Sequence, residues 1–249
     1  EFLRKKGIAK ASKKMSRVAS EGLALTYERG GEVSIIEINS ETDFVAKNKD
    51  FINFCKEISE INFKNKGDLE KVKNSNMKNK INVKDNLTDL ISKIGEKITL
   101  TRAKYFDSKK GNNFYYVHGA IEKDIGKIVS VVKVDNVIKG KNQDIGNKLA
   151  MHIAASSPLA IDKNGLKKEI LEKELEIIKA ELLNSGKKKE MIEKISQGKL
   201  NKFISDNTLL NQIWIMDPKK KVLDILKENS IDSELKILDF IRYKVGEGA

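Results

Sequence analysis

The feature that most constrains the fold of this chain is a pair of long amphipathic segments at residues 166–183 and 188–204. Apolar residues in the first segment recur at alternating intervals of four and three, which is the spacing of a coiled-coil seam. This seam consists of Leu171, Leu175, Ile178 and Leu182. Because the polar segment 184–187 supplies a short turn, we predict an antiparallel helical hairpin about 25 Å long at 1.5 Å per residue. Two helices bury little by themselves, so the hairpin must pack on the body of the chain, on a second copy or on a partner.

The rest of the chain alternates between strand-like and helical patterns, which predicts an α+β fold. Two β-rich runs, 23–27 and 33–38, flank the turn Arg29-Gly30-Gly31. Glycine accepts the positive φ of a tight turn, so these runs predict a β-hairpin. We predict further strands at residues 98–106, 114–118, 128–134 and 238–245. We predict helices at residues 45–61, 69–72, 87–94, 143–155 and 221–226, and we place the Lys- and Asn-rich segment 64–85 on the surface.

The charge balance favours a basic surface over a dedicated nucleic-acid site. The 249 residues include 48 Lys and Arg against 36 Asp and Glu, a net charge of +12. Only five of the basic residues are arginine, the side chain that phosphate and base recognition favours. Half of the net charge lies in residues 1–17, which predict a basic amphipathic helix. We interpret the charge as solvated lysine with weak, non-specific nucleic-acid binding at most; an RNA-binding protein is the alternative.

The residue types that enzymes use are scarce. One cysteine, Cys55, and two histidines, His118 and His152, are too few for a zinc site, and no nucleophile signature accompanies either histidine. We therefore interpret Cys55 as a buried thiol and the histidines as packed residues. Segment 119–128 is not a phosphate-binding loop, because its Gly-Lys dipeptide is followed by Ile128 where Ser or Thr is required. We expect no catalytic residue, no metal and no cofactor.

The sequence also argues against a membrane or secreted protein. No apolar run approaches the roughly 20 residues that cross a bilayer, and the N-terminus carries no segment typical of a signal peptide. A single cysteine cannot form an internal disulfide. We expect a soluble, cytoplasmic protein.

Seven short motifs occur in order along nearly the whole chain. They are LRKKGIAKA at 3–11, RVASEG at 17–22, TDFVAK at 42–47, KIGE at 93–96, HGA at 118–120, MHIAAS at 151–156 and YKVGEG at 243–248. Together they resemble the elongation factor Ts family, the guanine-nucleotide exchange factors of the translational GTPase elongation factor Tu. TDFVAK is the most specific of the seven. Segment 64–85 and both ends of the chain depart from the family pattern.

The resemblance implies two pseudo-symmetric subdomains, each with a small antiparallel sheet packed on helices. Residues 18–111 form the first, and residues 112–160 together with 210–249 form the second. The hairpin, residues 161–209, is inserted in the second subdomain and is a candidate module for self-association. Residues 1–17 correspond to the last helix of an N-terminal helical domain and its linker, so we expect a region before them.

The resemblance also implies which residues bind the partner. In the family, the TDFV segment pushes into elongation factor Tu beside its Mg²⁺ site; here these residues are Thr42, Asp43, Phe44 and Val45. Further contacts to the GTPase nucleotide domain are implied for Ile94, Gly95 and His118, and the second subdomain touches a different domain of the partner. The implied activity is promotion of GDP release, without covalent chemistry, so that GTP can bind.

Each of these residues also has a purely structural interpretation. Asp43 complements the positive end of a helix dipole, and Phe44 packs into the core of its own chain, which is worth roughly 1.5–3 kcal/mol. Gly95 ends the helix at 87–94 as a left-handed cap, which we expect in any case. His118 is then a packed strand residue.

Overall fold

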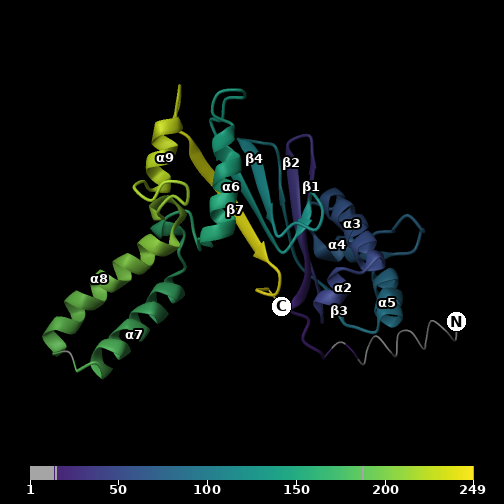
Figure 1. The fold of residues 1–249 in the computed structure, drawn as a ribbon, viewed down its shortest axis with the longest axis horizontal. Coiled ribbons are helices and arrows are strands. Elements are labelled where there is room, and N and C mark those ends of the chain that lie inside the picture. Colours follow the sequence, from purple (N-terminus) through teal and green to yellow (C-terminus); the bar gives the residue numbers. More distant parts are fainter. Residues whose placement is uncertain (1–13, 15, 187, 249) are drawn as a thin grey trace.

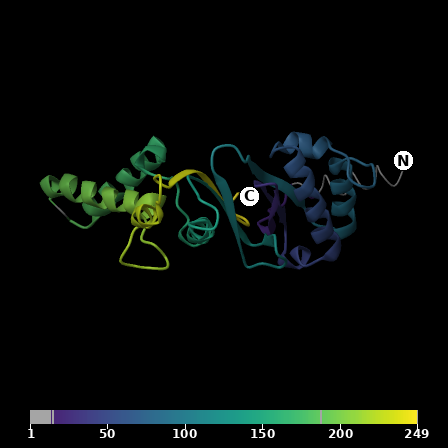
Figure 2. The same cartoon turned by 90° about the horizontal axis from the view of Figure 1, so that it is seen from above.

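The computed structural model describes residues 14, 16–186 and 188–248 (Figure 1). The predicted basic helix over residues 1–17 lies almost entirely outside the described residues. Within them, the fold is α+β, as predicted: two small antiparallel sheets are stacked face to face, with helices on the outer faces (Figures 1 and 2).

The first sheet has the strand order β3-β2-β1-β5. Its strands are β1 (Glu21–Arg29), β2 (Glu32–Ser40), β3 (Ile98–Phe106) and the two-residue β5 (Ile125–Gly126). The predicted hairpin at its centre is confirmed. Arg29 pairs with Glu32, and Gly30 and Gly31 between them have φ values of 64° and 80°, the left-handed conformation that a two-residue hairpin turn requires.

Four helices cover the outer face of this sheet: α2 (Asp43–Ala46), α3 (Lys49–Lys64), α4 (Leu69–Asn74) and α5 (Val83–Ile94). The predicted single helix at 45–61 is wrong at its start, because the chain breaks between α2 and α3. The Asn48 side chain accepts hydrogen bonds from the backbone N–H groups of Asp50 and Phe51 and so caps α3. As a result, the Asp-Phe-Val-Ala segment forms a separate four-residue helix.

The segment 64–85 is not merely a surface excursion, which corrects the prediction. It contains α4 as predicted, but Val72, Met77 and Val83 are buried in the same apolar cluster as α3 and the first sheet. Each of the three residues is flanked on both sides by a polar residue, so no apolar periodicity in the sequence predicts that their side chains are buried. The segment therefore contributes to the core between α3 and the first sheet.

The second sheet has the order β4-β6-β7, formed by β4 (Asn112–His118), β6 (Ile128–Asp135) and β7 (Lys236–Lys244). Its outer face packs on α6 (Asp144–Ser156), α9 (Val222–Asn229) and Trp214. Its inner face meets the first sheet through a layer that contains Ala24, Val33, Ile35, Val129 and Val131. Three apolar layers thus join the helices and the two sheets into one body.

Helices α7 (Lys168–Asn184) and α8 (Lys189–Asn207) lie side by side and extend away from the sheets (Figure 1). Ile178 and Leu182 of the predicted seam are buried against Ile192, whereas Leu171 and Leu175 are half-buried. At the base, the Leu159 N–H donates to the Asn207 carbonyl. Short 3₁₀ turns at Lys163–Gly165 and Leu209–Asn211 flank the pair.

A buried carboxylate fastens the C-terminal segment to the first sheet. Glu37, on β2, is fully buried and pairs with Arg102 Nε at 2.6 Å. Its other oxygen accepts hydrogen bonds from the Asn39 side chain at 2.9 Å and from the Gly246 N–H at 2.8 Å. The Arg102 guanidinium also lies 4.3 Å from the ring centroid of Tyr243 on β7. We call Glu37, Arg102 and Gly246 the Glu37 clasp.

Candidate functional site

The first element of the site is the short helix α2, which presents Phe44 to solvent. Phe44 is 79% exposed, while the next two residues, Val45 and Ala46, are buried against the first core. The interpretation of Phe44 as a core residue is therefore wrong. A large aromatic side chain thus stands on a helix whose other side is anchored, which leaves the ring free to contact a partner.

Asp43, beside Phe44, is half-buried, and its carboxylate is ionised. Its carboxylate accepts a hydrogen bond from Lys47 Nζ at 2.8 Å, and this bond is the main reason that the Asp43 pKa lies below its ordinary value. The positive charge of Lys127 lowers the pKa further. The Lys47 ammonium also lies 6.0 Å from the Phe44 ring centroid. The apolar ring is thus flanked by one carboxylate and one ammonium group.

Thr42 connects α2 to the loop after α5. Its backbone N–H donates to Glu96 Oε2 at 3.0 Å, and its hydroxyl donates to Glu96 Oε1 at 2.8 Å. Its carbonyl accepts from the Ser40 hydroxyl at 3.0 Å. Thr42 and Glu96 are 54 positions apart in the sequence, and no sequence pattern indicates that they are in contact. Glu96 was therefore not predicted as a site residue, although it is the last residue of the KIGE motif.

Gly95 ends α5 in the left-handed conformation, with φ of 85°, and its N–H donates to the Ile91 carbonyl. The predicted C-cap is confirmed. A Cβ on Gly95 would meet no atom within 4 Å, so the loop is open on its outer side, and Ile94 before it is half-buried against the first core. The Lys97 N–H donates to Glu41 Oε1 at 2.6 Å, which adds a third hydrogen bond between this loop and the start of α2.

His118 lies at the end of β4 on the second sheet, and its side chain is exposed, so it is not a packed strand residue. Its carbonyl accepts a hydrogen bond from the Lys127 N–H, and Lys127 Nζ lies 2.8 Å from Glu21 Oε2 on β1. Lys127 therefore joins His118 to the first sheet and contributes to the field at Asp43. The structure joins the start of α2 to the loop that contains Gly95, through Thr42 and Glu96. His118 lies beside Lys127, whose ammonium pairs with Glu21 on β1.

His152 is buried, and its ring packs against and hydrogen-bonds to neighbouring residues, as predicted. Its Nε2 is 3.0 Å from the side-chain oxygen of Gln212, and its ring stacks on Trp214 with centroids 5.1 Å apart. The Ile215 N–H donates to its Nδ1 at 3.4 Å. Burial disfavours the charged imidazolium and lowers the pKa of His152 below 6.5.

We predict from this shift that the imidazolium form of His152 loses one of its two N–H protons, and becomes neutral imidazole, with a midpoint below pH 6.5. Between the depressed native pKa and the ordinary value, the unfolded chain binds a proton that the native chain does not, so the free energy of unfolding decreases as the pH falls below about 6.5. An NMR titration of the imidazole signals measures this directly. A midpoint for His152 at or above 6.5 would contradict the assignment.

Thiol chemistry, metal binding and a membrane-spanning helix have little support in the described part of the chain. Cys55 is buried, and desolvation raises the pKa of its thiol well above the ordinary value. Residues 14, 16–186 and 188–248 contain no group of three or more His, Cys, Asp or Glu side chains arranged to hold a metal ion. The same ranges include no helix that is both long and apolar enough to span a membrane.

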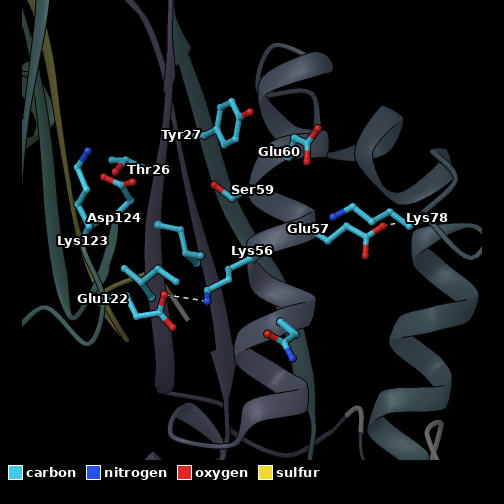
Figure 3. A pocket seen from close by; sticks show the side chains of 13 residues that line it. Thr26, Tyr27, Lys56, Glu57, Ser59, Glu60, Lys78, Glu122, Lys123 and Asp124 are labelled. Atoms are coloured by element: carbon cyan, nitrogen blue, oxygen red, sulfur yellow. Dashed lines mark hydrogen bonds and ion pairs between the residues drawn. The ribbon is translucent and has the colours of Figure 1, made fainter.

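A pocket of about 510 Å³ lies between α3, β1 and the segment before β5 (Figure 3). Lys56 and Glu122 face each other across it and form an ion pair at 2.7 Å. Its charged lining residues carry both signs: Lys56, Lys78 and Lys123, and Glu57, Glu60, Glu122 and Asp124. It contains none of the predicted site residues, whereas His118 lines a separate pocket of about 430 Å³ on the second sheet.

Comparison with known proteins identifies the family of the chain. The family model described as elongation factor TS matches residues 41–247. The chain is 36% identical to elongation factor Ts of Maricaulis maris and 37% identical to elongation factor Ts of Nitrobacter hamburgensis, and each alignment covers 100% of this chain and 81% of the relative. Elongation factor Ts of Rickettsia felis is 35% identical over the same shares. The chain therefore belongs to the elongation factor Ts family, which acts in translation elongation.

Proposed function

We propose that this chain is a guanine-nucleotide exchange factor: it binds elongation factor Tu in its GDP-bound form and promotes GDP release without covalent chemistry. The observation that carries the proposal is the 79% exposure of Phe44 on a helix anchored by Val45 and Ala46. Burying a side chain of this size in a partner stabilises the complex by roughly 1.5–3 kcal/mol.

The proposed mechanism is competition for the site of Mg²⁺ and phosphate in the partner. Mg²⁺ is held by few protein oxygens and requires near-ideal octahedral geometry, so insertion of the Asp43-Phe44 pair beside it weakens the metal site and the hold on the GDP phosphates. Exchange factor and nucleotide then weaken each other's binding by the same factor. Each 1.36 kcal/mol removed from the barrier to GDP release speeds release tenfold.

Ile94, Gly95 and His118 supply further contacts in this proposal. The first two are supported by the hydrogen bonds that join their loop to Thr42, and His118 by its exposure on the neighbouring sheet. We assign the contact with the nucleotide domain to residues 18–111 and to His118. The second subdomain, residues 112–160 with 210–249, is proposed to contact another domain of the GTPase, and residues 161–209 to offer a surface for self-association.

The test is a stopped-flow measurement of GDP release. Elongation factor Tu loaded with a fluorescent GDP is mixed with excess unlabelled nucleotide and increasing amounts of this protein. We expect a saturable acceleration of release, of at least about tenfold, which corresponds to about 1.4 kcal/mol. A release rate independent of the protein concentration would contradict the proposal.

A further inference from the structure

The helix that carries Phe44 is too short to hold its own orientation. α2 has four residues, so its backbone forms hardly more than one turn of hydrogen bonds. Thr42 occupies its N-cap position, where a threonine hydroxyl ordinarily accepts a hydrogen bond from a backbone N–H of the first turn. No such bond is present at Thr42. Local capping therefore does not explain how Phe44 is held outward.

Glu96 supplies the hydrogen bonds that hold the start of α2 in place of a local N-cap. Both carboxylate oxygens are used on Thr42: one accepts from its N–H at 3.0 Å and the other from its hydroxyl at 2.8 Å. Gly95 makes this possible, because its left-handed φ of 85° turns the chain out of α5. Hydrogen bonds to an ionised acceptor are roughly twice as strong as neutral ones, so a two-point attachment of this kind fixes both the position and the tilt of the first residue of the turn.

A reciprocal bond strengthens the attachment. The Glu41 carboxylate accepts from the Lys97 N–H at 2.6 Å, so each of the two adjoining chain segments uses a glutamate to hold the backbone of the other. Glu41 is also paired with Arg17 at 3.2 Å. Of these two glutamates, Glu96 is the one that bonds to Thr42, the residue directly before α2.

We propose that Glu96 is a positioning residue for Phe44: its carboxylate holds Thr42 so that α2 presents the ring in the orientation that enters the partner. The inference rests on the proposed exchange function, and it adds a residue that acts through Phe44 and need not touch the partner. The competing explanation is that Glu96 simply stabilises the end of α5.

A double-mutant cycle separates these two roles, because a residue that acts through another loses its effect when that other residue is impaired. The variants are Glu96→Ala, Phe44→Leu and their combination; leucine keeps a smaller apolar side chain, so that release remains measurable. In the parent protein, we expect Glu96→Ala to lower the acceleration of GDP release about tenfold, or about 1.4 kcal/mol. In a protein that already carries Phe44→Leu, we expect the same substitution to lower it less than twofold. Equal losses in both backgrounds, or no loss in the parent, would overturn the inference.

Two more variants sharpen the cycle. Glu96→Gln is expected to retain most of the activity, because the amide oxygen accepts from the Thr42 N–H while the amide N–H donates to the hydroxyl, which reverses its role. Glu122→Ala is the matched control, because it removes another glutamate that forms an ion pair, at the pocket of Figure 3. This variant is expected to accelerate GDP release from the GTPase as much as the parent protein does. A loss in Glu122→Ala as large as that in Glu96→Ala would overturn the specific role of Glu96.

Thermal unfolding of each variant guards against a folding defect. If Glu96→Ala shows no cooperative transition, Thr42→Val replaces it in the cycle, because this substitution removes only the hydroxyl bond. We then expect the acceleration of GDP release to fall about threefold in the parent protein, or about 0.65 kcal/mol. In the Phe44→Leu background we expect no further fall. The two hypotheses fail separately. If the parent protein does not accelerate release, the proposed function is wrong, whereas an active parent with an unaffected Glu96→Ala variant refutes only the positioning role.

Discussion

Replacing Phe44 by alanine is expected to remove most of the acceleration of GDP release while the fold stays intact. Because the side chain is 79% exposed, its truncation breaks few contacts within the chain, and the free energy of unfolding is expected to change by no more than about 0.5 kcal/mol. At an interface, truncation of a buried aromatic anchor costs about 2 kcal/mol or more. The release rate at a fixed protein concentration should therefore fall at least about tenfold.

The matched control is Ile81→Ala. Ile81 is another large apolar residue with an exposed side chain, 44%, and it belongs to the segment that connects α4 and α5. Stopped-flow release and thermal unfolding are measured for both variants. Unchanged release in Phe44→Ala, or the same loss in Ile81→Ala, would show that the aromatic ring is not the element that acts on the partner.

The second large effect concerns the Glu37 clasp and is expected in stability. Arg102→Met leaves the Glu37 carboxylate fully buried without its cationic partner. Breaking one side of a buried ion pair costs about 3–5 kcal/mol, since the remaining charge has lost both water and its counter-charge. For a chain of this length we expect the melting temperature to fall by about 10 °C.

Lys104→Met on the same strand provides the comparison. Lys104 pairs with Asp239 at 2.7 Å, but both side chains are partly exposed, at 32% and 46%. Surface ion pairs contribute about 0–1 kcal/mol, so this variant should unfold close to the parent. Equal melting temperatures for the two variants would mean that the Glu37 clasp does not hold the C-terminal segment to the first sheet.

Elements whose signals are local were predictable from the sequence. The hairpin of β1 and β2 follows from two β-rich runs around Gly30-Gly31, and α5 follows from its apolar periodicity and Gly95. The break between α2 and α3 also had a local signal, because Asn48 followed by Asp50 is a helix start. The prediction placed Val45 on the same apolar stripe as Phe51 and therefore missed the break, although residues 47–50 between them are all polar.

Non-local features were not predictable in the same way. β5 has two residues and acquires its conformation only by pairing with Ala24 and Leu25 of β1. The burial of Val72 and Met77 depends on where α4 meets the first core. In the site, the exposure of Phe44 and the attachment of Thr42 to Glu96 both depend on how distant segments pack. The family motifs predict the site residues, but the contacts that position Thr42 and Phe44 could be seen only in the fold.

The most direct test of the account is whether this protein and GDP weaken each other's binding to elongation factor Tu. The dissociation constant of GDP is measured by equilibrium titration without this protein and with a saturating amount of it, at constant Mg²⁺. Coupling between two such sites is typically 1–3 kcal/mol, so we predict that GDP binds at least about fivefold more weakly in the presence of the protein, and that Phe44→Ala abolishes most of this difference. A GDP dissociation constant that is unchanged at saturating protein would contradict the account.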